Sequence, residues 1–412
     1  MTRRVAISGI GLVSPLGIGA AENIDNAAAG RSAIARIEES PFATRLAAPL
    51  AARTRFDAAT HFAAPRLRML DRVSQLAIVA ARQAIEDSGC DLETADRDRV
   101  GVFVGCGMGG SSTMDDGYRT LYGDGSDRIK PFTILSGMHN APAAWIGSEF
   151  GIGGPNLTYS TACSSSAVAI GEAWLRIADG RLDLAIAGGA EAPLSLGSMK
   201  AWEAMQTLAS IDPHDPSTSC KPFARNRSGM VLGEGAALCL LEPWDHAVAR
   251  GARIHGELLG YGLTTDHGHI TRPSVDGQAA AMRAALRSAG LATAQVDAIN
   301  AHGTGTQAND AVETAAIKAV FGTRARDIPI SATKAMHGHL LGATAALECA
   351  LSLSAMQRGI ALPTLHLREA DAECDLDYVP LEARAGVQAR VMLSNSFAFG
   401  GTNAVLVVGA VP

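Results

Sequence analysis

The residue with the clearest chemical potential is Cys163, in the run TACSSS of residues 161–166. It follows a strand-like segment, residues 156–160, and precedes an apolar stretch with helical spacing, residues 165–178. A thiol at the first turn of a helix lies at the positive end of the helix dipole, which predicts a lowered pKa and a nucleophilic thiolate. Free cysteine is also among the most buried residue types, so an inert core thiol stays open as the alternative.

Three further motifs place polar side chains in turns after strand-like segments, where α/β proteins carry their chemistry. Glycine lets the backbone of such a turn approach a ligand, and threonine adds a hydroxyl that can donate or accept a hydrogen bond. The motifs are NAHGTGT with His302, Thr304 and Thr306, SATKAMHGHLLGA with Lys334 and His339, and NSFAFGGTN with Phe399.

Two other patterns suggest sites that we do not predict. The HGH pairs at 267–269 and 337–339 offer metal ligands, but no acidic or cysteine residue stands at regular ligand spacing, so no metal is expected. The run GCGMGG, residues 105–110, matches a dinucleotide fingerprint by its letters. The residues that follow, SSTMDDG, are a poor start for the helix that such a site needs, so we interpret the run as a substrate-facing loop.

The composition is that of an ordinary globular protein, with 47% of the 412 residues hydrophobic and 18% charged. A net charge of -6 disfavours nucleic acid as the main partner. No apolar run reaches the ~18 residues that a membrane span needs, so no membrane partner is expected and the chain is predicted to be cytoplasmic. The seven cysteines never form a C-x-x-C pair, which argues against disulfides and a structural zinc site.

Strand-like and helix-like segments alternate along the chain, which predicts a layered α/β fold. The chain also hints at a duplication. Residues 80–89 and 281–290 both have the pattern of a helix ending in glycine, and each leads through a short loop to a strand, at 100–105 and 296–301. The order of these segments predicts two related halves, residues 1–250 and 251–412.

Taken together, the motifs resemble those of the β-ketoacyl-acyl carrier protein synthases, the condensing enzymes of fatty acid and polyketide synthesis. The resemblance covers residues 5–408 and implies the thiolase-like fold, in which duplicated βαβαβαββ halves form five α-β-α-β-α layers. The first half would carry the cysteine, and the second the histidines and the lysine. The matching segments are those of Cys163, His302, Lys334, His339 and Phe399, together with PFxxNRxGxxLGEG at 222–235 and DxxHxTxP at 266–273.

The resemblance implies a 3-oxoacyl-acyl carrier protein synthase of the KAS II-like type. Cys163 would take an acyl group from an acyl carrier protein, and malonyl carrier protein would then extend it by two carbons with loss of CO2. The N–H groups of Cys163 and Phe399 would form the oxyanion hole, and Phe399 would also act as a gate. His302 and His339, as neutral imidazoles, would polarise the malonyl thioester.

Supporting roles follow from the same resemblance. Lys334 is expected to pair with Glu348 and hold the histidine loop, or to tune the histidines electrostatically. Thr304 and Thr306 would hydrogen-bond the pantetheine arm, and Met108 would shorten or gate the acyl pocket. No cofactor is expected, because the phosphopantetheine arm arrives with the carrier.

The implied partners are the acyl and malonyl forms of acyl carrier protein and a second copy of the chain in a homodimer. Because carriers of this kind are usually acidic, a basic docking patch is expected. The candidates for it are Arg66, Arg68, Arg72 and Lys130.

Departures from the family pattern leave the pathway open. Ala398 stands where most relatives carry glycine, and residues 205–210 lack an arginine that helps many relatives to dock the carrier. The residues present disfavour three other functions. A non-catalytic chain-length factor and a decarboxylase would both lack the cysteine, and a thiolase would carry a second catalytic cysteine where Ser396–Phe399 stands.

Overall fold

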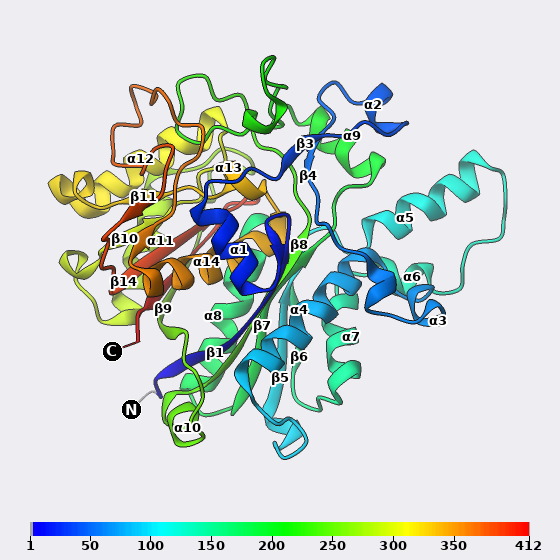
Figure 1. Ribbon diagram of the computed structural model, residues 1–412, viewed down its shortest axis with the longest axis horizontal. Helices are drawn as coiled ribbons and strands as arrows, with labels where there is room; N and C mark the ends of the chain where they lie inside the picture. Colours follow the sequence, from blue (N-terminus) through cyan, green and yellow to red (C-terminus); the bar gives the residue numbers. More distant parts are fainter. Residues whose placement is uncertain (1–2, 412) are drawn as a thin grey trace.

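The computed structural model of this chain describes residues 3–411, so residues 1, 2 and 412, at the ends of the two predicted halves, lie outside it. Its centre is one mixed sheet with the strand order β11-β10-β14-β15-β9-β1-β8-β7-β5-β6 (Figure 1). The strands are β1 (Val5–Ser14), β5 (Val100–Gly105), β6 (Asn156–Tyr159), β7 (Leu184–Glu191), β8 (Gly235–Pro243), β9 (Gly256–Thr265), β10 (Ala298–Asn300), β11 (Ile330–Ser331), β14 (Val391–Phe397) and β15 (Thr402–Gly409).

The sheet consists of two halves with the same internal order. With the strands of each half numbered along the chain, both halves follow the order third, second, fourth, fifth, first, as β6-β5-β7-β8-β1 and β11-β10-β14-β15-β9. Within each half only the fifth strand, β8 or β15, runs antiparallel to its neighbours. The halves join where β1 and β9 pair antiparallel. This repeat confirms the duplicated thiolase-like fold, while the position of the boundary at residue 250 stays a prediction.

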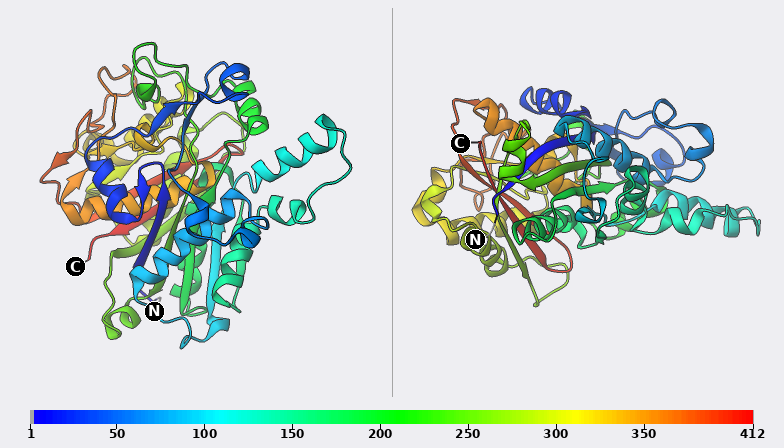
Figure 2. Two further views of the ribbon diagram at one scale, coloured as in Figure 1. Left: turned by 45° about the vertical axis from the view of Figure 1, so that its right-hand side comes forward. Right: turned by 90° about the horizontal axis from the view of Figure 1, so that it is seen from below.

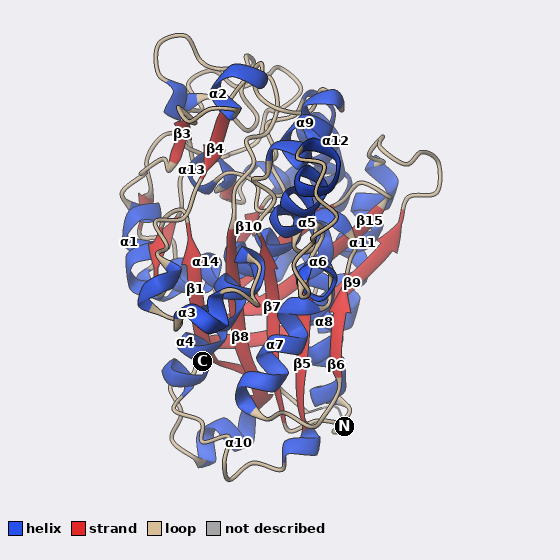
Figure 3. Ribbon diagram, turned by 90° about the vertical axis from the view of Figure 1, so that its right-hand side faces the viewer, coloured by secondary structure: helices blue, strands red, loops and turns tan. Residues whose placement is uncertain are grey.

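The helices form three layers, which alternate with the two halves of the sheet (Figures 1 and 3). This confirms the five-layer arrangement. The middle layer contains α8 (Ser165–Ala178) and α14 (Thr344–Arg358), which pack against each other between the two halves of the sheet. One outer layer contains α4 (Arg72–Ser88) and α7 (Ala141–Phe150), and the other contains α11 (Val275–Ala289) and α12 (Gln307–Phe321). Each helix layer has its own cluster of buried apolar side chains.

Because helices cover both faces of the sheet, its strands are apolar at nearly every position. In β8, residues 236, 238 and 240 belong to the outer cluster around α4. The alternate residues 237, 239 and 241 belong to the central cluster. This period of two is the one that a strand imposes on its side chains.

Most of the long elements lie where the sequence predicts them. The helix over 165–178 has the predicted bounds. The two helices predicted to end in glycine do so, because α4 ends before Gly89 and α11 ends before Gly290. One expectation is wrong: the residues after GCGMGG, predicted to be a poor start for a helix, do form one, α5 (Ser111–Tyr118). Its cap comes from elsewhere in the chain: Asp71 accepts hydrogen bonds from the backbone N–H of Thr113, at 2.9 Å, and from its hydroxyl, at 2.6 Å. A cap supplied by a distant residue is invisible in the local sequence.

The remaining elements are short and surround the sheet. The segment of α5 projects from the body of the molecule in all three views of Figures 1 and 2. Within residues 3–411, no helix is both long enough and apolar enough to cross a bilayer. The short elements are β2 (Gly17–Ile18), α1 (Ala20–Ala28), β3 (Ile34–Arg36), α2 (Phe42–Arg45), β4 (Leu50–Ala52), α3 (Ala64–Leu67), α6 (Thr133–Gly137), α9 (Leu196–Ala204), α10 (Trp244–Ala249), α13 (Lys334–His337), β12 (Ile360–Ala361) and β13 (Arg384–Ala385).

Small residues bring the first strand of each half close to the helix that covers it. A Cβ atom at Gly11 in β1 would lie 1.8 Å from the carbonyl oxygen of Ala80 in α4. A Cβ atom at Gly262 in β9 would lie 2.3 Å from the carbonyl oxygen of Ala281 in α11. Equivalent positions of the two halves therefore make the same contact, and each requires glycine because the backbones approach so closely.

Adding a methyl group at either contact is expected to destabilise the protein. Gly11→Ala and Gly262→Ala should each lower the free energy of unfolding by about 1–3 kcal/mol, because the helix must move away from the strand. The matched control is Gly268→Ala, whose added Cβ would have no neighbour within 4 Å. It should change the free energy by less than about 0.5 kcal/mol. Urea denaturation measures all three, and equal midpoints would contradict the prediction.

Candidate active site

Cys163 lies in a tight turn, Ala162–Ser164, between the end of β6 and the start of α8. Ala162 has a φ of 51°, a left-handed conformation that costs energy for a residue with a side chain. The hydroxyl of Ser165 closes the turn, because it accepts from the backbone N–H of Thr161 at 2.9 Å and donates to the carbonyl oxygen of Ala162 at 2.6 Å. The turn places the thiol at the helix N-terminus, with only 6% of the residue exposed.

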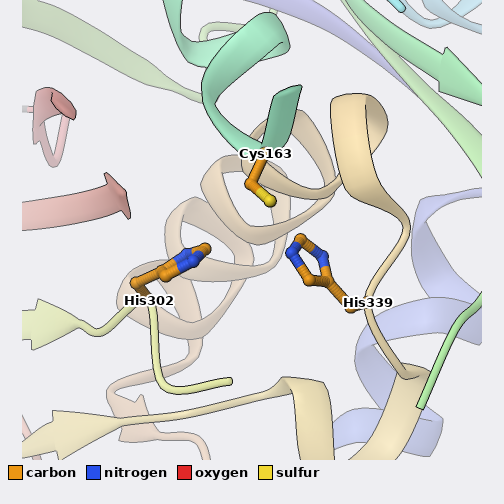
Figure 4. A group of neighbouring side chains, drawn as sticks. All are labelled: Cys163, His302 and His339. Carbon is orange, nitrogen blue, oxygen red and sulfur yellow. The ribbon is translucent and has the colours of Figure 1, made fainter. Parts of the chain in front are cut away.

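Two histidines from the second half converge on this thiol. His302 follows β10, and His339 lies in the turn between α13 and α14. Figure 4 shows the three side chains pointing into the same space. The Sγ of Cys163 and one ring nitrogen of each histidine all lie within 4.8 Å of one another. A thiol and two imidazoles are also ligands that zinc accepts, and the expectation of a metal-free site stays a prediction.

Burial determines the charge of these three groups. It raises the pKa of the Cys163 thiol to about 11, and the charge of Lys334 and the N–H of Phe399 lower that pKa by less. The lowered pKa expected from the helix terminus is therefore wrong for the free protein, because desolvation outweighs the favourable contacts. Burial also holds the pKa of His302 and of His339 well below the usual value, with Lys334 adding to the effect, so both imidazoles are neutral.

Hydrogen bonds select one tautomer of His339. The backbone N–H of Leu341 donates to Nδ1 at 3.2 Å, and the hydroxyl of Thr344 lies 2.9 Å from the same nitrogen. Nδ1 is thus the acceptor, and the ring hydrogen is on Nε2. Nε2 is buried, has no hydrogen-bond partner among the described residues, and lines the cavity above Cys163. It is available to donate to an oxygen of a bound substrate.

A buried carboxyl group holds the turn that carries His302. Glu313 of α12 accepts from the backbone N–H of His302 at 2.7 Å and from that of Gly303 at 2.9 Å. Asn395 of β14 donates to the same carboxyl at 3.1 Å. Burial raises the pKa of Glu313 to about 7. The sequence analysis missed this residue; its signal is an acidic side chain among the apolar positions of a helix, where burial is costly unless the group is hydrogen-bonded.

Lys334 and Glu348 form an ion pair inside the protein. Nζ lies 2.8 Å from Oε1, and the two side chains are 0% and 1% exposed. Nζ also donates to the carbonyl oxygen of His302. The lysine therefore ties the His302 turn to α14, and its charge lowers the pKa of both histidines. Both of the roles considered for Lys334 have a geometric basis.

A cavity of about 190 Å³ opens above these groups. Its lining includes Cys163, both histidines, Thr304 and Thr306. The hydroxyl oxygens of the two threonines lie 2.8 Å apart, on the turn that leads into α12. The cavity thus combines a thiol and two neutral imidazoles with a hydroxyl-bearing wall, which suits a thioester on a polar arm.

Phe399 lies beside the cysteine in the turn between β14 and β15, and its backbone N–H is within hydrogen-bonding reach of the thiol. Its ring stacks on Trp202 of α9, with 6.1 Å between the ring centroids. The N–H of Gly400 donates to the carbonyl oxygen of Ile270 at 2.8 Å, which ties this turn to residues 266–273 on the cavity wall. Because alanine has less backbone freedom than the glycine of most relatives, Ala398 is expected to make this turn less mobile, which stays a prediction.

A second buried carboxyl group, that of Glu191 at the end of β7, binds the GCGMGG loop. It accepts from the backbone N–H of Gly107 at 2.8 Å and from that of Met108 at 2.9 Å. Because a carboxyl group occupies these donors, the loop is unsuited to a phosphate, which agrees with the prediction that it holds no dinucleotide. None of residues 105–110 lines the cavity of Cys163, and their substrate-facing role stays a prediction. The Met108 side chain lies outside the cavity lining, in an apolar cluster with Met199 and Leu341, and its effect on the acyl pocket stays a prediction.

Two of the four basic residues suggested for carrier docking are engaged within the protein. Arg72 donates to the buried Glu234 at 2.6 and 2.7 Å, and Arg66 pairs with a carboxylate of α7. Both charges are therefore balanced within the protein, and a part in docking stays a prediction for these two residues. Arg68 and Lys130 are exposed and form no ion pair within residues 3–411.

Comparisons with known proteins point to one family. The chain matches the family described as "Beta-ketoacyl synthase, N-terminal domain" over residues 2–247, and "Beta-ketoacyl synthase, C-terminal domain" over residues 255–368. It is 42% identical to Nodulation protein E of Rhizobium sp. (strain N33) over 98% of this chain and 99% of that protein. It is 38% identical to 3-oxoacyl-[acyl-carrier-protein] synthase 2 of Staphylococcus aureus (strain COL) over 98% of both chains.

A solved structure supports the same conclusion. A type II polyketide ketosynthase, bound to a hexaketide and in complex with its acyl-carrier protein, superposes with a TM-score of 0.92 at 29% identity, over 100% of both chains. The fold, the convergence of one cysteine and two histidines, and the two matched domains agree with one another. The chain belongs to the β-ketoacyl synthase family.

Proposed function

We propose that this protein condenses an acyl group with malonyl-acyl carrier protein to give a 3-oxoacyl-acyl carrier protein and CO2. The observation that carries the proposal is the meeting of the Cys163 thiol with two neutral imidazoles in one buried cavity. The reaction needs a nucleophile for acyl transfer and two donors for a developing enolate, and these three groups supply both.

In the first half-reaction the Cys163 sulfur attacks the acyl thioester. The new carbon–sulfur bond forms as the bond to the carrier sulfur breaks, and the thiol proton ends on the departing carrier thiol. Negative charge on the carbonyl oxygen would be stabilised by the backbone N–H groups of Cys163 and Phe399, both of which reach the region of the sulfur.

In the second half-reaction the malonyl thioester oxygen would accept hydrogen bonds from His302 and from Nε2 of His339. Loss of CO2 leaves the bonding electron pair in the enolate, whose carbon attacks the acyl carbonyl and expels the Cys163 sulfur. Because these N–H donors are already oriented and shielded from water, little reorganisation is needed when the enolate forms. The hydroxyls of Thr304 and Thr306 would hold the pantetheine arm along the cavity wall.

The finer identity that we propose is KAS II-like, with acyl carrier protein as partner and no cofactor. One relative is a 3-oxoacyl-[acyl-carrier-protein] synthase 2, and one structural neighbour is seen with its carrier. Carrier docking would use exposed basic residues such as Arg68 and Lys130. Exposed apolar side chains in and near α5 and α6 support the expected homodimer. Among them are Tyr122, at 79% exposure, and Ile134, at 63% exposure. Light scattering of the purified protein checks it.

Replacing the nucleophile tests the proposal directly. Cys163→Ala should lower condensation by on the order of a thousandfold or more, because the acyl-sulfur intermediate can no longer form. Incubation with a panel of acyl carriers, followed by peptide mass spectrometry, should find the acyl group on Cys163 of the unmodified protein. Cys90→Ser, at a half-buried cysteine after α4, is the matched control and should keep full activity. Full condensation by Cys163→Ala would exclude the mechanism.

Removing the buried ion pair separates the two roles of Lys334. Lys334→Met alone should cost about 3–5 kcal/mol, because the Glu348 carboxyl group loses its partner. The double variant Lys334→Met/Glu348→Leu should regain most of that stability without regaining condensation, since the His302 carbonyl remains unsupported. Thermal unfolding and steady-state condensation measure the two effects. Parallel recovery of both would show that the pair is only structural.

The pH dependence of the same double variant has a defined direction. Lys334 lowers the pKa of both histidines, so its removal should raise those pKa values. An imidazole is neutral only at a pH above its pKa. In the profile of malonyl decarboxylation rate against pH, the acid limb should therefore move to higher pH. An unmoved acid limb would exclude an electrostatic role for Lys334.

Met108→Gly tests the proposed pocket residue. If Met108 limits the acyl pocket, the variant should accept longer acyl carriers, because the side chain that would fill the space is gone. The chain-length profile of acyl groups trapped on Cys163 measures this. A profile equal to that of the unmodified protein would show that Met108 is a packing residue.

A further inference from the structure

Glu191 is a fully buried carboxyl group that the reaction described above does not use. It ends β7, with 0% of the residue exposed. No arginine, lysine or histidine pairs with it within residues 3–411. Burying such a group is costly unless hydrogen bonds compensate, so its partners show what it holds in place.

The partners of Glu191 come from both halves of the protein. Its Oε1 accepts from the N–H of Met108 at 2.9 Å, and its Oε2 accepts from the N–H of Gly107 at 2.8 Å. Oε2 also accepts from the N–H of Gly342 at 3.0 Å. Gly107 and Met108 follow β5 in the first half, whereas Gly342 lies three residues after His339 in the second. One side chain therefore fastens a loop of the first half to a loop of the second.

The Gly342 contact determines how His339 is oriented. Leu341 has a φ of 44°, a conformation that costs energy for a leucine. In this conformation its N–H donates to Nδ1 of His339, which leaves the ring hydrogen on Nε2 toward the cavity. The next N–H, that of Gly342, is held by Glu191. The carboxyl group thus fixes the strained turn that selects the tautomer of His339.

The two loops also touch directly. A Cβ atom on Gly342 would lie 2.7 Å from the backbone nitrogen of Gly107 and 2.8 Å from Oε2 of Glu191. The Met108 side chain packs in the same apolar cluster as Leu341. A shift of the Met108 loop therefore cannot occur without displacing the turn that orients His339.

We propose that Glu191 is a positioning residue for the condensation step, joining the Met108 loop to the His339 turn so that the loop after β5 and the His339 donor move together. The inference rests on the proposed function, because it assigns His339 to the malonyl half-reaction. Acyl transfer to Cys163 does not use His339 and depends on the N–H groups of Cys163 and Phe399. Loss of Glu191 should therefore affect the two half-reactions unequally.

The test compares the half-reactions in Glu191→Leu, which keeps the volume of the side chain but removes its acceptors. Malonyl decarboxylation and condensation should fall at least about thirtyfold, whereas the rate of acyl transfer to Cys163 should change less than about threefold. Glu191→Gln keeps one acceptor oxygen and should restore part of the loss. Gly342→Ala, which pushes the turn away from the carboxyl group, should show the same selective loss and serves if Glu191→Leu does not fold.

The matched control is Glu242→Leu, at another fully buried strand carboxyl group, which bonds to Arg250 and His246 away from the site. It should lower the thermal midpoint without separating the two half-reactions. Equal losses in both half-reactions of Glu191→Leu and Gly342→Ala would overturn the proposal.

A spectroscopic measurement tests the role of Glu191 independently of enzymatic activity. With ¹⁵N-labelled histidine, the unmodified protein should show His339 as a single neutral tautomer with the hydrogen on Nε2, assigned by the peaks lost in His339→Ala. Glu191→Leu or Gly342→Ala should give a mixture of tautomers, and unchanged His339 peaks would overturn the positioning role. If the unmodified protein condensed no acyl carrier, the proposed function would fail while this measurement still tested Glu191.

Discussion

The exclusion of water from the space between the two halves of the sheet is the constraint on which the rest of the site depends. It keeps His302 and His339 neutral, raises the pKa of the Cys163 thiol, and obliges each buried carboxyl group to find donors. Glu313 and Glu191 accept from backbone N–H groups of the turns that carry His302 and His339, whereas Glu348 pairs with Lys334. The protonation states and the positions of the groups around the cavity therefore have one common cause.

The duplicated architecture explains why residues so distant in sequence meet. Cys163 follows β6, the third strand of the first half, and His339 follows β11, the third strand of the second. Because the halves repeat the same strand order, the turns after equivalent strands reach the same end of the central helix layer. Close glycine contacts, such as that of Gly11 with Ala80 and its counterpart at Gly262, keep the outer helices at matching depth. The site lies at the junction of two similar units.

Local patterns were sufficient for most of the long elements, and the family resemblance singled out Cys163, His302 and His339, which the structure brings together. The helix after Cys163 has the predicted bounds, because its apolar spacing is strong and its start is marked by small polar residues. The helix α5 was missed because its cap, Asp71, lies just before α4, about forty residues away in the sequence. The pKa of Cys163 was predicted in the wrong direction, since the degree of burial is a tertiary property.

Glu191 and Glu313 escaped the sequence analysis for a related reason. Nothing in the residues around them shows that their partners are turns elsewhere in the chain. Arg72 shows the same limit from the other side, since this candidate docking residue pairs with the buried Glu234 while its own side chain stays 32% exposed. In such a protein, the sequence alone does not show which polar groups face each other after folding.

The two helices of the middle layer both begin beside the cavity, which affects the electrostatic potential there. α8 begins directly after Cys163, α14 begins shortly after His339, and the turns before them are in contact. The backbone N–H of Ala346 in the first turn of α14 even donates to the hydroxyl of Ser166 in that of α8, at 3.0 Å. The positive ends of two helix dipoles thus point into one dry space. The scaffold itself provides a standing positive potential there, which favours any species that becomes anionic during the reaction and needs no mobile counter-ion.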